Sequence, residues 1–116
     1  MEQPVRLWHV TLTVAGDTEP LETVHCALQA LQGEQPFLHS VRYDDDRAEL
    51  QYWEEGDEMI DAASLALRLW NEHRGTAGLP AWKVVGLEVL DQETMQARGQ
   101  STPLAQAAGM PRRFGR

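Results

Sequence analysis

The sequence predicts one α+β domain whose elements follow the order strand, helix, strand, strand, helix, strand. Four segments alternate apolar and polar residues with the two-residue period of half-buried strands, and two longer segments repeat apolar residues at helical spacing. The chain has 116 residues, enough for one core but too few for two. Its 42% hydrophobic and 24% charged residues are typical of a globular protein.

The first strand and the first helix are both expected near the N-terminus. Val5–Val14 is rich in β-branched residues and alternates, which predicts a strand. Asp17–Pro20 resembles a helix start, with a capping side chain and a proline in the first turn, and Gly33 would close the helix. Its apolar stripe is Leu21, Val24, Leu28 and Leu31. The strand would place Trp8, Val10, Leu12 and Val14 on one face, and Leu7, His9, Thr11 and Thr13 on the other.

The next two strands form a predicted β-hairpin. Phe37–Tyr43 and Ala48–Glu54 flank the acidic turn Asp44–Arg47. Alternation along the second of these strands would direct one set of side chains to the core, namely Ala48, Leu50 and Tyr52. The opposite set is Glu49, Gln51 and Trp53.

The second helix is expected over Asp57–Arg74, ending at Gly75. Its predicted core stripe is Met59, Ile60, Ala63, Leu67 and Trp70. The apolar arc is widened further by Ala62, Leu65 and Leu69. Such a wide arc exceeds the needs of a one-sided helix. Either residues 91–110 cover this flank, with Met95, Leu104 and Met110 supplying apolar contacts, or a partner protein does.

The last strand is predicted over Trp82–Leu90, followed by a short helix over Asp91–Ala97. Its inward residues would be Val85, Leu87 and Val89. Its outward residues would be Trp82, Val84, Gly86 and Glu88. Residues 1–97 then form the domain, and 98–116 a basic, loosely structured tail.

Two strand–helix–strand halves joined by a hairpin predict a ferredoxin-like sandwich. In that architecture a four-stranded antiparallel sheet, in the order 4-1-3-2, carries both helices on one face. The other face would stay uncovered, and two tryptophans on it would be unusual for a surface that meets only water. We expect this face to bind a ligand or a second subunit through Leu7, His9, Thr11, Arg42, Gln51, Trp53, Trp82 and Val84, with Leu38, Ser40, Glu49 and Glu88 also on it.

Charge is unevenly distributed along the chain. Six basic and eighteen acidic residues give residues 1–97 a charge of −12, and four arginines give the tail +4. A body this acidic repels phosphate backbones, so we expect no nucleic-acid binding. The tail could contact an anionic partner or the acidic body itself. No apolar run is long enough to span a membrane, no secretion signal is evident, and the single Cys26 forms no internal disulfide, so we expect a soluble cytoplasmic protein.

Few residues suggest chemistry. The histidines at positions 9, 25, 39 and 73 lack zinc-site spacing, and Asp44–Asp46 lacks the pattern of a calcium loop. No nucleophile elbow or phosphate-binding glycine loop is present. We therefore expect no metal and no cofactor. His9, beside Trp53, is the one candidate for proton transfer, against the simpler hypothesis of an inert interface histidine.

Two family resemblances bear on these residues. Val10–Leu21 (VTLTVAGDTEPL), the helix after it and Phe37–Tyr43 resemble an ACT-type regulatory domain, which implies an amino-acid site at a subunit interface near that turn. In topology alone, the domain is also similar to dimeric α+β barrels, a class that includes cofactor-free oxygenases and isomerases.

These observations predict a binding or regulatory module without catalytic machinery of its own. We expect it to form a homodimer or to bind a small ligand through the uncovered sheet face. The alternative is a small dimeric-barrel enzyme that uses His9. A third hypothesis is a protein partner bound by the tail, residues 99–116.

Overall fold

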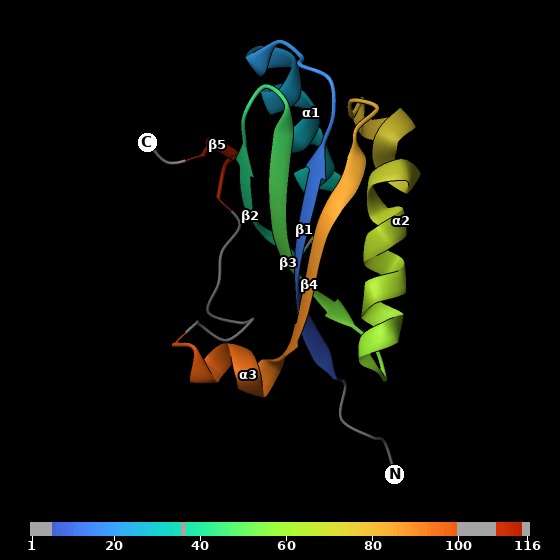
Figure 1. The fold of residues 1–116 in the computed structure, drawn as a ribbon, viewed down its shortest axis with the longest axis vertical. Coiled ribbons are helices and arrows are strands. Elements are labelled where there is room, and N and C mark those ends of the chain that lie inside the picture. Colours follow the sequence, from blue (N-terminus) through green and yellow to red (C-terminus); the bar gives the residue numbers. More distant parts are fainter. Residues whose placement is uncertain (1–5, 36, 100–108, 115–116) are drawn as a thin grey trace.

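The computed structural model describes residues 6–35, 37–99 and 109–114. Within them it contains one mixed sheet of five strands and three helices, which confirms the predicted α+β class (Figure 1). The elements follow the chain as β1 (Leu7–Ala15), α1 (Leu21–Glu34), β2 (Leu38–Tyr43), β3 (Arg47–Glu55), α2 (Met59–Ala77), β4 (Lys83–Asp91), α3 (Gln92–Ala97) and β5 (Arg112–Arg113).

The strands lie in the order β4-β1-β3-β2-β5. β1 is antiparallel to both β3 and β4, β2 and β3 form the predicted hairpin, and β5 runs parallel to β2. The predicted sheet of four antiparallel strands is therefore wrong in strand number. β5 consists of two arginines inside the predicted tail, and a two-residue strand has neither alternation nor hydrophobicity to reveal it.

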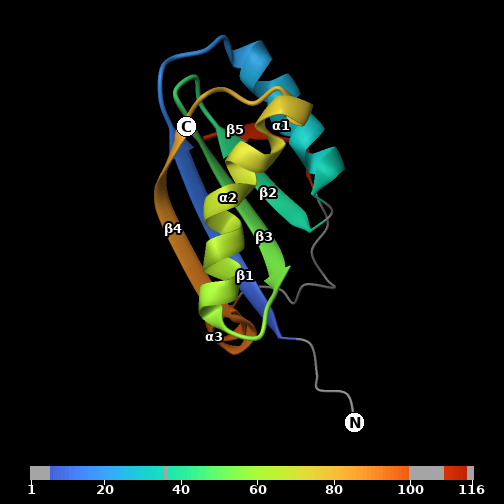
Figure 2. The same ribbon diagram turned by 90° about the vertical axis from the view of Figure 1, so that its right-hand side faces the viewer.

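Both long helices pack on the same face of the sheet, α2 over β1 and β4 and α1 near β2 (Figure 2). The inward residues predicted for β1 and β3 are all buried in this layer. Leu28 and Leu31 of α1 are fully buried against them. At one end of the core the indoles of Trp70 and Trp82 stack, with ring centroids 6.0 Å apart and planes 5° from parallel.

α1 begins at Leu21 without the predicted side-chain cap, and it ends one residue beyond Gly33, at Glu34. Instead, the loop before the helix is held by the β2–β3 turn. The backbone N–H groups of Gly16 and Glu19 donate to the carbonyls of Asp46 and Asp45, at 3.0 and 2.8 Å. These tertiary hydrogen bonds fix the loop that leads into α1, although they satisfy none of the N–H groups in the first turn of the helix itself.

α2 ends three residues later than predicted, and the face that it buries differs from the predicted core stripe. It begins at Met59 after a capping box between Glu58 and Asp61, and ends at Ala77, where Gly78 adopts the left-handed conformation with φ 73°. Its buried residues are Ala62, Ala66, Leu69, Trp70 and Ala77. Most of the predicted stripe is thus wrong: Ala62, Ala66, Leu69 and Trp70 face the core, whereas Met59, Ile60 and Leu67 are exposed. None of the helices in the described ranges is long and apolar enough to cross a membrane.

Irregularities in two strands reverse the predicted facing of several side chains. In β4, Thr13 pairs with Gly86 but Val14 pairs with Val84, so Val85 is an extra residue that bulges. Val84 and Trp82 therefore pack in the helix–sheet core, contrary to the prediction for the uncovered face. In β2, a register shift between Leu38 and Ser40 likewise buries Leu38 against Tyr52.

Candidate functional site

The sheet face opposite α1 and α2 brings together most of the predicted site residues. His9 pairs with Trp53, and Thr11 with Gln51, across β1 and β3. On the same face, Arg42 in β2 approaches Glu49 at 3.9 Å. Of the eight predicted site residues, six share this face: Leu7, His9, Thr11, Arg42, Gln51 and Trp53. The other two, Trp82 and Val84, do not.

The centre of this face is closed by the chain itself. Asp91 caps α3 by accepting a hydrogen bond from the Thr94 N–H at 2.7 Å, and the helix directs Met95 onto the sheet. Met95 is 4% exposed, and His9 and Trp53 only 3% and 2%. The prediction that residues 91–110 cover the flank of α2 is therefore wrong where they are described. Met95 lies on the opposite side of the sheet, Met110 is exposed, and Leu104 lies outside the described residues.

Two imidazoles meet on this face. The Nε2 atoms of His9 and His39 are 3.0 Å apart, a hydrogen bond in which one ring donates and the other accepts. The His9 ring also meets Trp53 edge to face, with centroids 5.0 Å apart. His9 Nδ1 is buried and has no hydrogen-bond partner among the described residues. A buried polar atom without a hydrogen-bond partner lowers the free energy of unfolding, so burial of His9 Nδ1 destabilises the fold.

Burial controls the protonation of both rings. Burial, and secondarily repulsion from His39, lower the pKa of His9 to about 4. Burial also lowers the pKa of His39 below its usual value. Both imidazoles are therefore neutral near pH 7. A neutral imidazole can accept a proton or a hydrogen bond, but a substrate would first have to reach a side chain that is 3% exposed.

A small hollow lies beside His9. It has a volume of about 180 Å³ and is lined by His9, Thr11, Gln51, Glu88, Met95 and Arg98. Arg98 approaches Glu88 at 3.5 Å, so opposite charges lie close together at this site. Pockets for drug-sized ligands usually exceed roughly 300 Å³. The hollow therefore suits only a polar molecule of a few heavy atoms.

Sequence pattern missed three residues of this site. His39 reaches the face because of the irregularity in β2, which alternation cannot reveal. Met95 and Arg98 come from the short helix after β4, whose helical character was predicted but whose direction was not. The other histidines hold the fold together: His25 contacts the Tyr43 hydroxyl at 3.1 Å, and His73 contacts Glu34 at 2.6 Å. Within the described ranges, no three His, Cys, Asp or Glu side chains are grouped to hold a metal ion.

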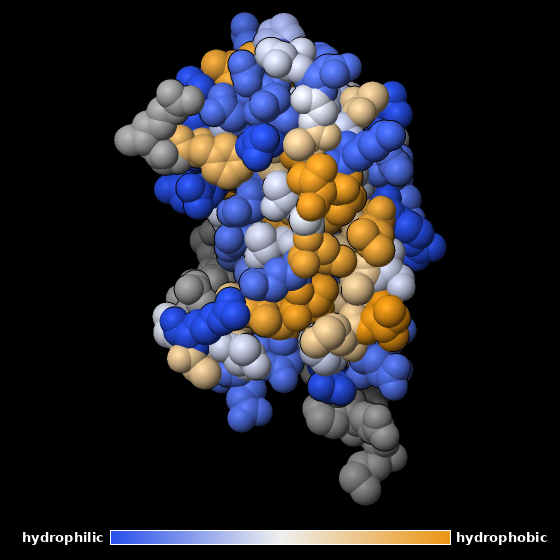
Figure 3. All heavy atoms as spheres, in the orientation of Figure 1, coloured by the Kyte–Doolittle hydropathy of each residue, from blue (hydrophilic) through white to orange (hydrophobic). Residues whose placement is uncertain are grey.

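A second candidate surface is apolar and lies at the β4 edge of the sheet, where α2 packs beside β4. We define the α2–β4 surface as Met59, Ile60, Leu67, Val85 and Leu87, which are 36–64% exposed. Only two further large hydrophobic residues of the described chain, Phe37 and Met110, are comparably exposed. Figure 3 shows the resulting hydrophobic band where β4 and α2 run side by side. Along its outer edge, β4 pairs with no other described strand.

Comparison with known proteins assigns the chain to a family. No curated protein matches the sequence. One family model matches residues 7–106, which span the whole sheet except β5, together with all three helices. The chain therefore belongs to the family described as Domain of unknown function (DUF8830).

Proposed function

We propose that this protein is a non-catalytic binding module that associates with a second copy of itself through the α2–β4 surface. The observation that carries the proposal is the concentration of exposed aliphatic side chains there. Five of the seven large exposed hydrophobic residues in the described ranges lie on α2 or β4. Apolar groups gathered in this way, beside an unpaired strand edge, are typical of protein interfaces.

A second copy fits this surface because a two-fold contact uses it twice. Full burial of an aliphatic side chain is worth roughly 1.5–3 kcal/mol, and these five are about half exposed. Each copy therefore gains roughly 4–8 kcal/mol, and the pair roughly twice that. Association costs roughly 4–15 kcal/mol in lost motion and ordering. We expect a reversible dimer with a dissociation constant in the micromolar range or weaker.

Glutamate substitution within the surface tests this proposal. In Leu67→Glu the new carboxylate would be buried against the partner, and we expect the dimer dissociation constant to rise at least roughly tenfold. Leu67 is 50% exposed on a helix, where glutamate is well tolerated, so the monomer should stay folded. Sedimentation equilibrium gives the dissociation constant, and circular dichroism checks the fold.

Phe37→Glu is the matched control. Phe37 is 53% exposed and lies outside the α2–β4 surface, so the same change of charge and hydrophobicity should leave dimerisation unchanged. The proposal fails if the unsubstituted protein sediments as a monomer at millimolar concentration. It fails equally if the two substitutions weaken the dimer to the same extent.

A small-ligand site beside His9 is a second candidate function. The buried, unpartnered Nδ1 and the polar hollow next to it support this candidate. An enzyme of the dimeric-barrel kind would use the same imidazole, but it needs more room for a substrate than about 180 Å³. A binding role is therefore better supported than catalysis.

We also propose an extended ferredoxin-like classification for the fold. The arrangement β4-β1-β3-β2 within the sheet and the shared face of α1 and α2 support it, with β5 and α3 as additions. The resemblance to ACT domains, with an amino-acid ligand near residues 15–21, stays a prediction.

A further inference from the structure

The C-terminal segment 109–114 lies along the outer edge of β2 like a bound peptide. Arg112 and Arg113 pair in parallel with Arg42 and Tyr43, and the Phe114 N–H donates to the Tyr43 carbonyl at 2.8 Å. Figure 1 shows this short strand, β5, extending the sheet beyond β2. Addition of an extended peptide to a sheet edge is a common mode of peptide recognition.

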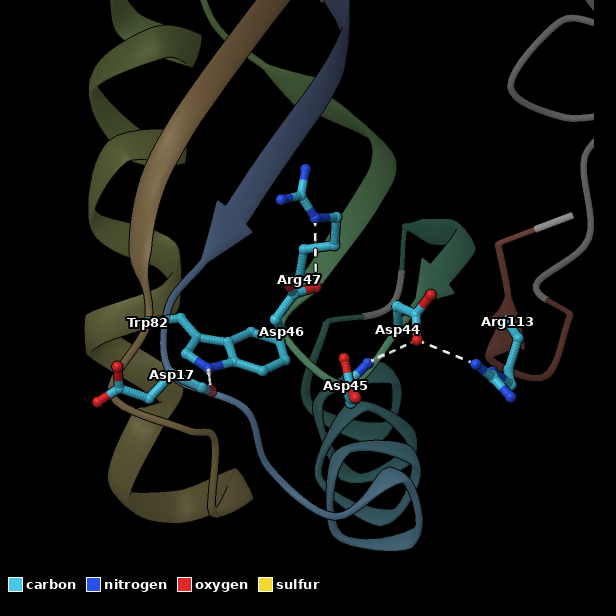
Figure 4. A network of polar contacts seen from close by, with 7 residues as sticks. All are labelled: Asp17, Asp44, Asp45, Asp46, Arg47, Trp82 and Arg113. Carbon is cyan, nitrogen blue, oxygen red and sulfur yellow. Dashed lines mark hydrogen bonds and ion pairs between the residues drawn. The ribbon is translucent and has the colours of Figure 1, made fainter.

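Side chains of the segment make specific contacts with the edge. Arg113 Nη2 lies 3.0 Å from Asp44 Oδ1. Figure 4 marks this contact between the two side chains with a dashed line. The Arg42 guanidinium lies over the Phe114 ring, 5.3 Å from its centroid. Pro111 is buried, and Gln32 of α1 donates to the Gly109 carbonyl. The edge thus contacts a basic residue and an aromatic residue that follow a buried proline.

The receiving turn is held by the domain rather than by the segment. The Asp44 N–H donates to the Arg47 carbonyl at 2.8 Å, and Asp44 Oδ1 accepts from the Asp45 N–H at 2.9 Å. The carbonyls of Asp45 and Asp46 accept from the loop before α1. The Asp44 carboxylate is therefore oriented by bonds that do not involve residues 109–114, which is the preorganisation that favours binding.

We propose that the β2 edge and the Asp44–Asp46 turn form a peptide-binding site, and that residues 109–114 occupy it as an intramolecular competitor. The partner is an extended peptide in which proline is followed by two basic residues and an aromatic residue. Acidic residues at the turn match the basic pair, and the exposed backbone of β2 supplies sequence-independent hydrogen bonds. This site is separate from the α2–β4 surface, at the opposite edge of the sheet.

The internal segment is held weakly enough to be displaced. Each hydrogen bond or exposed ion pair changes a binding constant by roughly tenfold or less. A short tether supplies an effective concentration on the order of millimolar. An external peptide of equal affinity therefore replaces the internal one at a free concentration of about a millimolar, and a tighter-binding partner does so at a proportionally lower concentration.

A peptide with the sequence of residues 109–116, Gly-Met-Pro-Arg-Arg-Phe-Gly-Arg, tests the proposal on the full-length chain. In the double variant Arg113→Glu, Phe114→Ala the internal segment loses two of its contacts, so this variant should bind a fluorescent form of the peptide at least roughly fivefold more tightly than the unsubstituted chain. Adding Asp44→Asn to that variant should weaken binding several-fold. Fluorescence anisotropy gives the three dissociation constants.

A scrambled peptide of the same composition separates recognition from simple attraction to an acidic protein. Equal binding of the two peptides overturns the proposal. Hydrogen exchange on the unsubstituted chain provides a test that does not depend on variants. Saturating peptide should accelerate exchange of the Phe114 amide, because that amide loses its bond to Tyr43. Unchanged exchange at saturation, or failure of the released variant to bind, overturns the proposal.

Discussion

His9 is a buried imidazole whose protonation the fold opposes. Its ring is buried between Trp53 and His39, and its pKa falls from 6.5 to about 4. The unfolded chain therefore takes up a proton before the folded chain does as pH falls. The stability that neutral His9 contributes is complete above pH 6.5 and is lost progressively as pH falls toward 4.

Acid titration of stability should reveal this linkage. Between pH 6.5 and 4 we expect His9 to account for a loss of roughly 3 kcal/mol in the free energy of unfolding, since each pKa unit corresponds to about 1.4 kcal/mol. In His9→Phe most of this loss should disappear, because phenylalanine does not titrate. Urea denaturation at half-unit pH steps measures both profiles. Parallel profiles for the two proteins would contradict the assignment.

Close packing between β1 and β4 depends on a glycine. A Cβ atom on Gly16 would lie 3.2 Å from the Trp82 Cα and would overlap the indole ring. Trp82 cannot withdraw easily, because its Nε1 donates to the Asp17 carbonyl at 2.8 Å and its ring stacks on Trp70. The end of β1 and the approach to β4 are thus joined by one tight contact.

Alanine substitutions at two glycines should have opposite effects. Gly16→Ala should destabilise the domain by roughly 1–3 kcal/mol through overpacking against Trp82. Gly75→Ala should stabilise it by roughly 0.5–1 kcal/mol, because Gly75 lies inside α2 with open space where its Cβ would be. Thermal unfolding of both variants measures the difference. Equal shifts in melting temperature would contradict this account of the Gly16 contact.

Sequence pattern predicted elements well wherever their hydrogen bonding is regular. β1 and β3 pair without interruption over nine residues, so alternation placed His9, Gln51 and Trp53 on the correct face. In β4 the facing predicted from alternation was wrong, because the bulge at Val85 has a small free-energy cost and leaves no signal in the sequence. The sequence of α2 contains two overlapping apolar stripes. The stripe that includes Ala62 and Ala66 faces the sheet, because these small side chains let the helix approach closely.

Only part of the candidate sites was predictable at the level of the whole molecule. The uncovered face followed from the arrangement of elements, but its closure by Met95 depends on the direction of the chain after β4. The α2–β4 surface could not be predicted from the sequence, because it depends on which face of α2 is buried. The basic tail was predicted to contact an anionic partner or the acidic body, and Arg113 contacts Asp44 of the body.

Net charge should make self-association depend on salt. Each chain carries a formal charge of −8, so two copies repel each other, whereas the α2–β4 surface is mainly apolar. Raising ionic strength from about 0.02 to 0.5 M shortens the screening length from roughly 20 Å to 4 Å and should strengthen the dimer by roughly two- to fivefold. Sedimentation equilibrium at both salt concentrations measures the change. A dimer that weakens with salt would indicate ion pairs rather than apolar contact at the interface.

The parallel indoles of Trp70 and Trp82 also give the protein an optical signature. Their transitions couple at a centroid separation of 6.0 Å, so the pair should dominate the near-ultraviolet circular dichroism spectrum. One ring comes from α2 and the other from the residue preceding β4, so slippage of the helix along the strand would uncouple the two chromophores. The near-ultraviolet spectrum thus reports, without an added label, on the contact between α2 and the start of β4.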